Sequence, residues 1–189
     1  MNGMTICAYL WMGFLVVWLI WAFRTKPTER RESISSRLSY TVLTIAAFYA
    51  MFSGDVPRGW LRTHLFPESL AIQVAGVLIT AGGIAFAIWA RVYLGGNWSS
   101  SVTVKVEHQL IRSGPYRWVR HPIYSGMILA LVGTALERGQ VRGLVAVVLA
   151  YAGFKIKSKI EERTMTSTFG AEYEDYSRST GAIVPKLRV

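Results

Sequence analysis

Residues 70–94 read LAIQVAGVLITAGGIAFAIWARVYL, a stretch in which Arg91 carries the only charge. A helix that crosses a membrane needs about 20 mostly apolar residues, so this stretch is long enough to span a lipid bilayer. It also contains small residues that would let a neighbouring helix approach closely; they are Gly76, Gly82, Gly83 and Ala87. The stretch therefore predicts a transmembrane helix that packs tightly against a second helix.

The composition of the whole chain indicates a membrane protein. Of the 189 residues, 52% are hydrophobic and only 17% are charged, and the mean hydropathy is +0.32, which is too apolar for an ordinary soluble domain. There is no internal repeat, low-complexity tract or linker, so we treat residues 1–189 as a single domain. The single cysteine, Cys7, lies in an apolar run and can form no intrachain disulfide.

The net charge of +10 does not indicate a nucleic-acid partner. The basic residues lie between apolar runs and do not form one contiguous face, as a nucleic-acid interface would require. We therefore expect membrane lipid as the surroundings, no nucleic acid, and no obligate protein partner.

Five segments are apolar enough to be candidate spans: residues 5–23, 38–53, 70–94, 123–136 and 141–158. Lys and Arg number five in 24–37, two in 54–69, four in 95–122, two in 137–142 and seven from 155 to the end. Cytoplasmic loops carry the excess of Lys and Arg, so this alternation places the first and third connections and the C-terminal segment in the cytoplasm and the N-terminus outside.

The fold class that follows is an all-α, integral membrane helical bundle of about five transmembrane helices. It would pass through the membrane several times, with a cytoplasmic cofactor pocket over the last two helices. An arrangement with four full spans, in which the fourth and fifth segments form a re-entrant hairpin, gives the same placement of the loops. The sequence does not separate the two arrangements. Either way, the functional residues are expected in residues 95–189.

The first cytoplasmic segment ends in RSGPYRWVRHPIYSG at residues 112–126. Proline is favoured at the first position of a helix, so Pro122 predicts a helix start with His121 as its cap. A helix N-terminus suits an anion, and Arg120 and His121 would add donors aimed at it. Gly126, one turn further on, would let a ligand approach the backbone. Arg112 and Arg117 are interpreted as binding lipid phosphates or orienting the loop.

The second cytoplasmic segment begins with KIKSKIEERTMTSTFGAEYEDY at residues 155–176. Glu161 and Glu162 lie just past a membrane helix, where carboxylates are costly unless they are paired or functional. Lys157 shares a helical face with Glu161. By itself the segment would also fit an amphipathic tail lying on the bilayer surface.

The two segments together resemble the isoprenylcysteine carboxyl methyltransferase family and its relatives among phospholipid methyltransferases. The resemblance is carried by HQLIRSGPYRWVRHPIYSG, then EERTMTSTFGAEYEDY, and then Pro185, and it covers roughly residues 70–187. Met165 stands where the family prefers leucine. The chain has too few spans for the larger eukaryotic members, so it is similar to the compact prokaryotic type.

The resemblance implies an integral membrane methyltransferase that uses S-adenosylmethionine and has its active site facing the cytoplasm. The residues that it implies for cofactor binding are His108, Gln109, Leu110, Ile111, Tyr116, His121, Pro122, Ile123, Tyr124 and Glu161. The basic residue implied for substrate binding is Lys157. The catalytic candidates are Arg120, Glu161 and Glu162. The substrate would be a lipophilic small molecule or a lipidated molecule, most simply a carboxylate.

The chemistry leaves alternatives open. A carboxylate arrives ionised and needs no base, whereas a phospholipid or other amine would need Glu161 or Glu162 to remove a proton. Membrane sterol and enone reductases, which use NADPH, share a similar C-terminal architecture but have about twice as many spans. A non-catalytic membrane protein would explain the spans and the basic loops, but not the paired motifs. A metal site is not expected, because His64 and His108 lie at no useful spacing from His121.

Overall fold

The computed structural model describes residues 2–22, 28–31, 33–56, 59–95, 98, 103–105 and 110–186. Its long helices are α1 (Gly3–Ala22), α2 (Ile34–Phe52), α3 (Leu70–Leu94), α4 (Pro122–Arg138) and α5 (Val141–Phe169), followed by the short α6 (Ala171–Ser179). Two short 3-10 turns are η1 (Trp60–Arg62) and η3 (Gly114–Arg117). The strands β1 (Thr28–Arg31) and β2 (Thr103–Lys105) form one small antiparallel pair. The predicted all-α bundle is therefore confirmed, with this one short sheet added.

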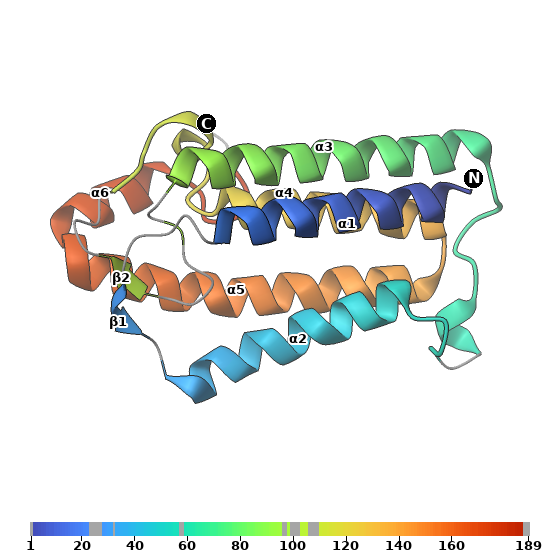
Figure 1. Ribbon diagram of the computed structural model, residues 1–189, viewed down its shortest axis with the longest axis horizontal. Coiled ribbons are helices and arrows are strands. Elements are labelled where there is room, and N and C mark those ends of the chain that lie inside the picture. The colour runs from blue at the N-terminus through green and yellow to red at the C-terminus, as the bar shows by residue number, and fades with distance from the viewer. Residues whose placement is uncertain are drawn as a thin grey trace.

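The five long helices lie side by side and alternate in direction (Figure 1). Helices α1, α3 and α5 run one way, and α2 and α4 run back. Each of the five predicted spans lies largely within one of these helices. The two strands, α6 and the end of α5 gather at one end of the bundle, which we call the site end. The N-terminus, η1 and the turn between α4 and α5 lie at the opposite end, which we call the far end.

Two helices are long and apolar enough to cross a membrane, namely α1 over Gly3–Trp21 and α3 over Leu70–Leu94. Both present large apolar side chains outward: Leu19 is 63% exposed and Leu78 is 66% exposed. Such exposure is costly in water and favourable in lipid. The structure therefore agrees with a membrane protein, while the number of crossings stays a prediction.

Helix α5 is longer than the apolar segment that predicts it. The sequence predicts a span at 141–158, but the helix continues to Phe169, and at about 1.5 Å per residue its whole length is about 44 Å. Lys155, Lys157 and Lys159 do not end the helix, because a charged side chain limits burial in lipid and not helix formation. This continuation carries Glu161 and Glu162 beyond the apolar part of the bundle.

Helices α3 and α4 are in direct backbone contact along their small residues. A methyl group at Gly126 would lie 2.7 Å from the backbone nitrogen of Ala87, and one at Gly76 would lie 2.7 Å from that of Glu137. A methyl group at Gly83 would lie closer still to the backbone nitrogen of Ala130. The predicted role of Gly76, Gly83 and Ala87 in helix packing is confirmed.

Two of the glycines have roles that differ from the expectation. A methyl group at Gly82 would meet no atom of another described segment within 4 Å, so Gly82 does not belong to the packed stripe. Gly126 was expected to let a ligand approach the backbone, but that interpretation is wrong because helix α3 occupies the space in front of it.

Buried polar side chains connect α1 to this helix pair. The Trp11 indole N–H donates to the Thr134 hydroxyl at 3.1 Å, and the hydroxyls of Thr134 and Thr80 lie 3.2 Å apart. Nearer the site end, Arg91 is 1% exposed and donates to the Trp21 carbonyl at 2.8 Å. Its guanidinium lies 4.2 Å from the centroid of the Trp98 ring. These contacts fix the last turn of α1 to α3 near the candidate site.

Candidate active site

The site is built around the start of α4. His121 is the N-cap residue and Pro122 is the first helical residue, as predicted; the His121 side chain makes no capping bond. The chain just before it pairs with residues 181–182 near the C-terminus. The Arg120 backbone N–H donates to the Gly181 carbonyl at 2.8 Å, and that of His121 donates to the Ala182 carbonyl at 2.9 Å. A C-terminal segment thus covers the start of α4.

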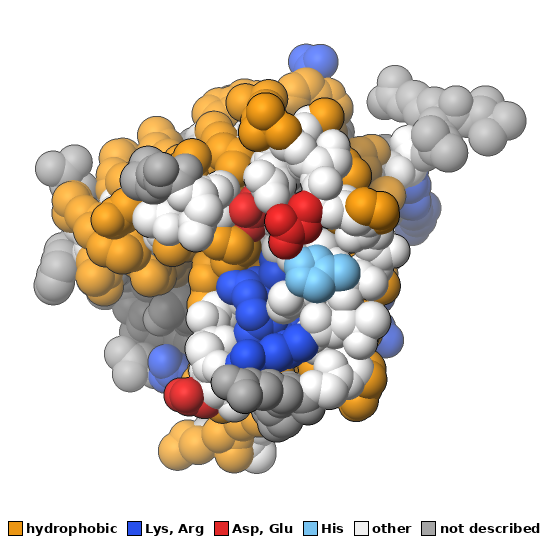
Figure 2. Space-filling model, turned by 90° about the vertical axis from the view of Figure 1, so that its right-hand side faces the viewer, with side chains coloured by type: hydrophobic (Ala, Val, Ile, Leu, Met, Phe, Trp, Pro, Cys, Tyr) orange, Lys and Arg blue, Asp and Glu red, His pale blue; other side chains and the backbone are white. Residues whose placement is uncertain are grey.

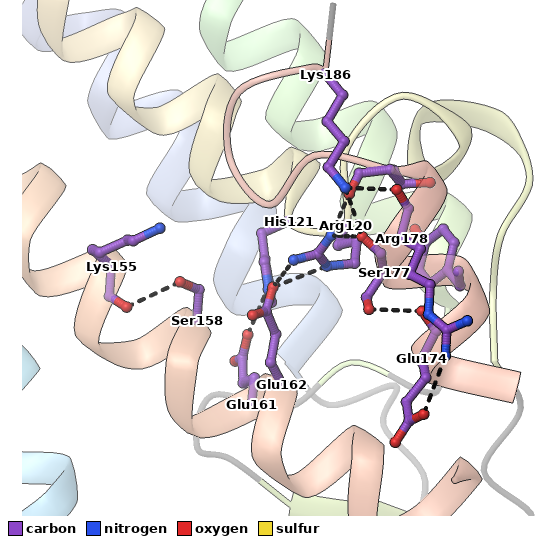
Figure 3. Close-up of polar contacts among 12 residues, drawn as sticks. Arg120, His121, Lys155, Ser158, Glu161, Glu162, Glu174, Ser177, Arg178 and Lys186 are labelled. Carbon is purple, nitrogen blue, oxygen red and sulfur yellow. Dashed lines mark hydrogen bonds and ion pairs between the residues drawn. The ribbon is translucent and has the colours of Figure 1, made fainter. Parts of the chain in front are cut away.

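Four charged side chains meet there, namely Arg120, His121, Glu161 and Glu162, and we call them the His121 cluster (Figure 3). The Nδ1 atom of His121 lies 3.2 Å from Oε2 of Glu161, and its Nε2 atom lies 3.2 Å from Oε1 of Glu162. Arg120 donates to the same Glu162 oxygen from Nε at 2.9 Å and from Nη2 at 2.6 Å. The two sequence motifs therefore meet in a single polar cluster.

The contacts of this cluster favour its charged forms. Burial disfavours protonation of His121, but hydrogen bonds to Glu161 and Glu162 raise its pKa above 6.5. Burial also disfavours the Glu162 carboxylate, yet its bonds with His121 and Arg120 lower its pKa to about 2. The pKa of Glu161 is lowered in the same way, against burial, chiefly by His121. An imidazolium with both N–H groups donating to carboxylates is therefore the stable form.

Aromatic side chains line one side of the cluster. The Tyr124 hydroxyl donates to Oε1 of Glu161 at 2.6 Å. The Tyr124 ring stacks on His121 at a centroid distance of 5.5 Å and on Phe154 at 5.0 Å. The Lys157 ammonium lies 5.2 Å from the ring centroid of Tyr40 and 5.6 Å from that of Tyr124. The predicted substrate residue, Lys157, thus lies on the same side of α5 as Glu161.

The side chains of Arg120 and His121 contact carboxylates and carbonyls of the chain itself. Both ring nitrogens of His121 contact Glu161 or Glu162. Arg120 uses its remaining nitrogen, Nη1, to donate to the carbonyls of Ser177, at 3.0 Å, and Thr180. The anions that contact Arg120 and His121 come from α5, so these side chains form an internal ion-pair cluster. Their role toward an external anion stays a prediction.

The other predicted cofactor residues are apolar or packed. Tyr116 is buried, donates from its hydroxyl to the Ala90 carbonyl at 3.3 Å, and accepts at its own carbonyl from Tyr176. Pro122 and Ile123 are buried at the start of α4, and Leu110 and Ile111 are half-buried. His108 and Gln109 lie outside the described residues.

Reasoning from the sequence missed the C-terminal segment that closes the site. Ser125 donates to the Ile183 carbonyl at 2.5 Å, which adds to the pairing at residues 181–182. Nothing in the pattern around Ile183 indicates this contact. Tyr40 and Phe154 were also missed, because each is an ordinary aromatic residue in an apolar run. Arg112 forms an exposed ion pair with Glu172 at 2.6 Å, which agrees with a role in orienting the loop.

Among the residues that the structure describes, no group of three or more His, Cys, Asp or Glu side chains is arranged to hold a metal ion. The polar chemistry at the site end is therefore that of carboxylates, an imidazolium, a guanidinium and a tyrosine hydroxyl.

Comparison with known proteins gives a family match over the part of the chain that holds both motifs. The model of the phospholipid methyltransferase family matches residues 71–172. Protein-S-isoprenylcysteine O-methyltransferase of Saccharomyces cerevisiae is 31% identical over 151 residues, covering 74% of this chain and 63% of that protein. The enzyme of the same name from Rattus norvegicus is 28% identical over 161 residues, covering 82% and 54%.

A differently named relative and a solved structure are also similar. The cobalt-zinc-cadmium resistance protein CzcN of Cupriavidus metallidurans is 27% identical over 129 residues, covering 68% of this chain and 54% of that protein. The solved eukaryotic intramembrane Ras methyltransferase ICMT has a similar fold, with a TM-score of 0.59 and 24% identity over 82% of this chain and 54% of that one. The chain thus spans between about half and two thirds of the length of these relatives.

Proposed function

Because this chain belongs to the phospholipid methyltransferase family, we propose that it is a membrane methyltransferase that uses S-adenosylmethionine to methylate a lipophilic carboxylate of the isoprenylcysteine type. One observation carries the proposal: the two motifs meet in the His121 cluster, at one end of an apolar bundle. The relatives named protein-S-isoprenylcysteine O-methyltransferase favour the carboxylate as the acceptor.

The residues of the cluster fit the cationic and hydroxyl-bearing parts of this cofactor. Glu161 and Glu162 keep 23% and 26% of their side chains exposed, while Arg120 and His121 keep about a tenth. The carboxylates are therefore the accessible groups, and they would accept hydrogen bonds from an ammonium or from ribose hydroxyls. S-adenosylmethionine supplies an electrophilic methyl group on a sulfonium sulfur. His121 and Arg120 would hold the two carboxylates in place.

The acceptor chemistry follows from the charges around Lys157. Methyl transfer to a carboxylate needs alignment of the reactants and exclusion of water, and it needs no base. The Lys157 ammonium, held beside the rings of Tyr40 and Tyr124, would attract and orient that carboxylate. The stacked rings of His121, Tyr124 and Phe154 would keep water away from one side.

An amine acceptor fits the cluster less well. A base must take a proton from an ammonium, and the low pKa of Glu161 and of Glu162 makes both weak bases at neutral pH. The contacts of both carboxylates with His121 support O-methylation over the phospholipid N-methylation that the family name would suggest.

The site end is proposed to face the cytoplasm, with five helices crossing the membrane. The described parts of the three segments with five, four and seven basic residues lie at this end, and the described parts of the two segments with two each lie at the far end. Single cysteines at Ser113 and at Ser179, in a Cys7→Ser background, should be shielded from an impermeant thiol reagent in intact cells. One at Asp55 should be labelled. Labelling at Ser113 from outside would contradict this orientation.

Calorimetric titration of the purified protein in detergent tests the cofactor. We expect saturable binding of S-adenosylmethionine and none of NADPH. Binding of NADPH alone would support the reductase alternative, and binding of neither would support a non-catalytic membrane protein.

A further inference from the structure

A polar pocket lies at the far end of the bundle, on the side opposite the His121 cluster. It is an open hollow between the start of α3 and the end of α4. The lining residues that matter to its chemistry are His64, Phe66, Glu68, Gln73, Glu137 and Arg138. Figure 2 shows this face, with acidic side chains beside a histidine and above a group of basic side chains.

Glu137 is the buried acid of this pocket. It lies in the last turn of α4, and its side chain is 9% exposed. The backbone N–H of Met4 donates to it, and a methyl group at Gly3 would lie 2.5 Å from its Oε1 atom. Glu137 thus binds the start of α1, where a carboxylate is favoured by the helix dipole.

The other oxygen of Glu137 has no such partner. Its Oε2 atom is buried and accepts no hydrogen bond from any residue that the structure describes. A buried carboxylate oxygen that accepts no bond has lost its hydration without compensation. A donor from outside the described residues would satisfy this oxygen, and the pocket is where that donor would enter.

The remaining lining groups define the donor. Glu68 is a second, exposed carboxylate close enough to Glu137 to act on its charge. Arg138 offers a buried Nε–H that also has no hydrogen-bond partner among the described residues. Two carboxylates and one guanidinium line the pocket, so a ligand with a cation for Glu137 and an acceptor for Arg138 would match them. Phe66 adds an aromatic ring, which suits an ammonium.

The position of the pocket favours an amphipathic ligand. Leu65 and Leu70 beside it are 45% and 76% exposed, which is the exposure expected where a bundle leaves lipid. A divalent metal is not favoured, because no three metal-binding side chains come together among the described residues.

We propose that this far-end pocket binds a primary ammonium group that has a phosphate next to it, as in phosphatidylethanolamine or free phosphoethanolamine. The ammonium N–H groups donate to Glu137 Oε2 and are attracted by Glu68. The phosphate accepts from Arg138 Nε. The site is separate from the methyl-transfer chemistry, so the failure of either proposal leaves the other standing.

Native mass spectrometry of the full-length protein, released from detergent, tests the proposal. We expect phosphatidylethanolamine to be retained about fivefold or more over phosphatidylcholine, whose quaternary ammonium has no N–H to donate to Glu137. Displacement by phosphoethanolamine would show that the headgroup alone is recognised. If phosphoethanolamine does not displace the retained phosphatidylethanolamine, the site recognises the intact lipid.

Variants make the test specific. Glu137→Gln should remove the preference for phosphatidylethanolamine over phosphatidylcholine. Glu68→Gln should reduce it, and because Glu68 is exposed this change should not disturb folding. Asp55→Asn is the matched control, because Asp55 is an exposed acid at the same end that does not line the pocket. Equal retention of the two lipids by the parent, an unchanged preference in Glu68→Gln, or displacement of the lipid by Zn²⁺ would overturn the proposal.

Discussion

The imidazole of His121 lies 3.2 Å from the carboxylate of Glu161, through Nδ1 and Oε2, and this contact joins residues that lie 40 positions apart. It brings the start of α4 against the part of α5 that extends beyond its apolar segment. Glu162 contacts the other ring nitrogen, so the imidazolium is held between two carboxylates. The geometry of the proposed cofactor site depends on this arrangement.

Loss of either partner should weaken cofactor binding. His121→Ala removes the cation between two carboxylates, and Glu161→Gln removes an accessible negative charge. We expect each change to raise the Kd for S-adenosylmethionine about tenfold or more, as measured by calorimetry. Arg117→Ala is the control, because the Arg117 guanidinium lies over the exposed Trp118 ring and outside the cluster. Unchanged binding in all three variants would refute this assignment.

Arg120 should matter for stability more than any exposed arginine. It is 10% exposed and joins Glu162 to the carbonyls of Ser177 and Thr180. We expect Arg120→Ala to lower the free energy of unfolding by about 2–4 kcal/mol, because the partly buried Glu162 carboxylate loses two N–H donors. Arg112→Ala breaks an ion pair that is half exposed and should cost at most about 1 kcal/mol. Thermal unfolding in detergent measures both, and equal losses would count against the role given to Arg120.

The cluster should make stability depend on pH at both limits. The pKa of His121 is raised above its ordinary value of 6.5. Its contribution to the free energy of unfolding is therefore fully present below pH 6.5 and is lost as the pH rises through the raised pKa. The pKa of Glu162 is lowered from its ordinary value of 4.5 to about 2. Its contribution to the free energy of unfolding is therefore present above pH 4.5 and is lost as the pH falls toward about 2. Melting temperatures across this range should fall at both ends. His121→Gln should lack the alkaline fall, and a parent-like alkaline fall in that variant would point to another group.

Helix packing offers a matched pair of glycines. Gly126→Ala places a methyl group against the backbone of Ala87, whereas Gly82→Ala places one in open space. We expect the first to lower the free energy of unfolding by about 1–3 kcal/mol and the second to be neutral or slightly stabilising. Thermal unfolding of both variants in the same detergent makes the comparison. Similar melting temperatures would mean that α3 and α4 are less tightly packed than described.

Much of the fold could be predicted from the sequence, because apolar length and glycine spacing act locally. The segment at 70–94 has the bounds of α3, and Pro122 starts α4 as its missing N–H suggests. The end of α5 could not be predicted from hydropathy, because lysines stop burial in lipid without stopping a helix. Which of Gly82 and Gly83 faces α4 depends on helix rotation, and that is set by tertiary contacts.

Only part of the site could be predicted from the sequence. The sequence indicated the importance of Arg120, His121, Glu161 and Glu162, but a cationic helix start does not say where its anion comes from. The structure supplies that anion from α5. The closure by residues 181–183 rests on two backbone hydrogen bonds and one from the Ser125 hydroxyl. In all three the acceptor is a backbone carbonyl, which every residue carries, so the pattern around Ile183 does not indicate the contact.

Transfer of a labelled methyl group tests the central claim most directly. The purified protein would be incubated with methyl-labelled S-adenosylmethionine and either S-farnesylcysteine with a free carboxylate or phosphatidylethanolamine. We predict that the label appears on the prenylcysteine as a base-labile ester and does not appear when its carboxylate is already esterified. The rate of methyl transfer should fall about a hundredfold or more in Glu161→Gln. Base-stable label on phosphatidylethanolamine, or ester formation that Glu161→Gln leaves unchanged, would contradict the account.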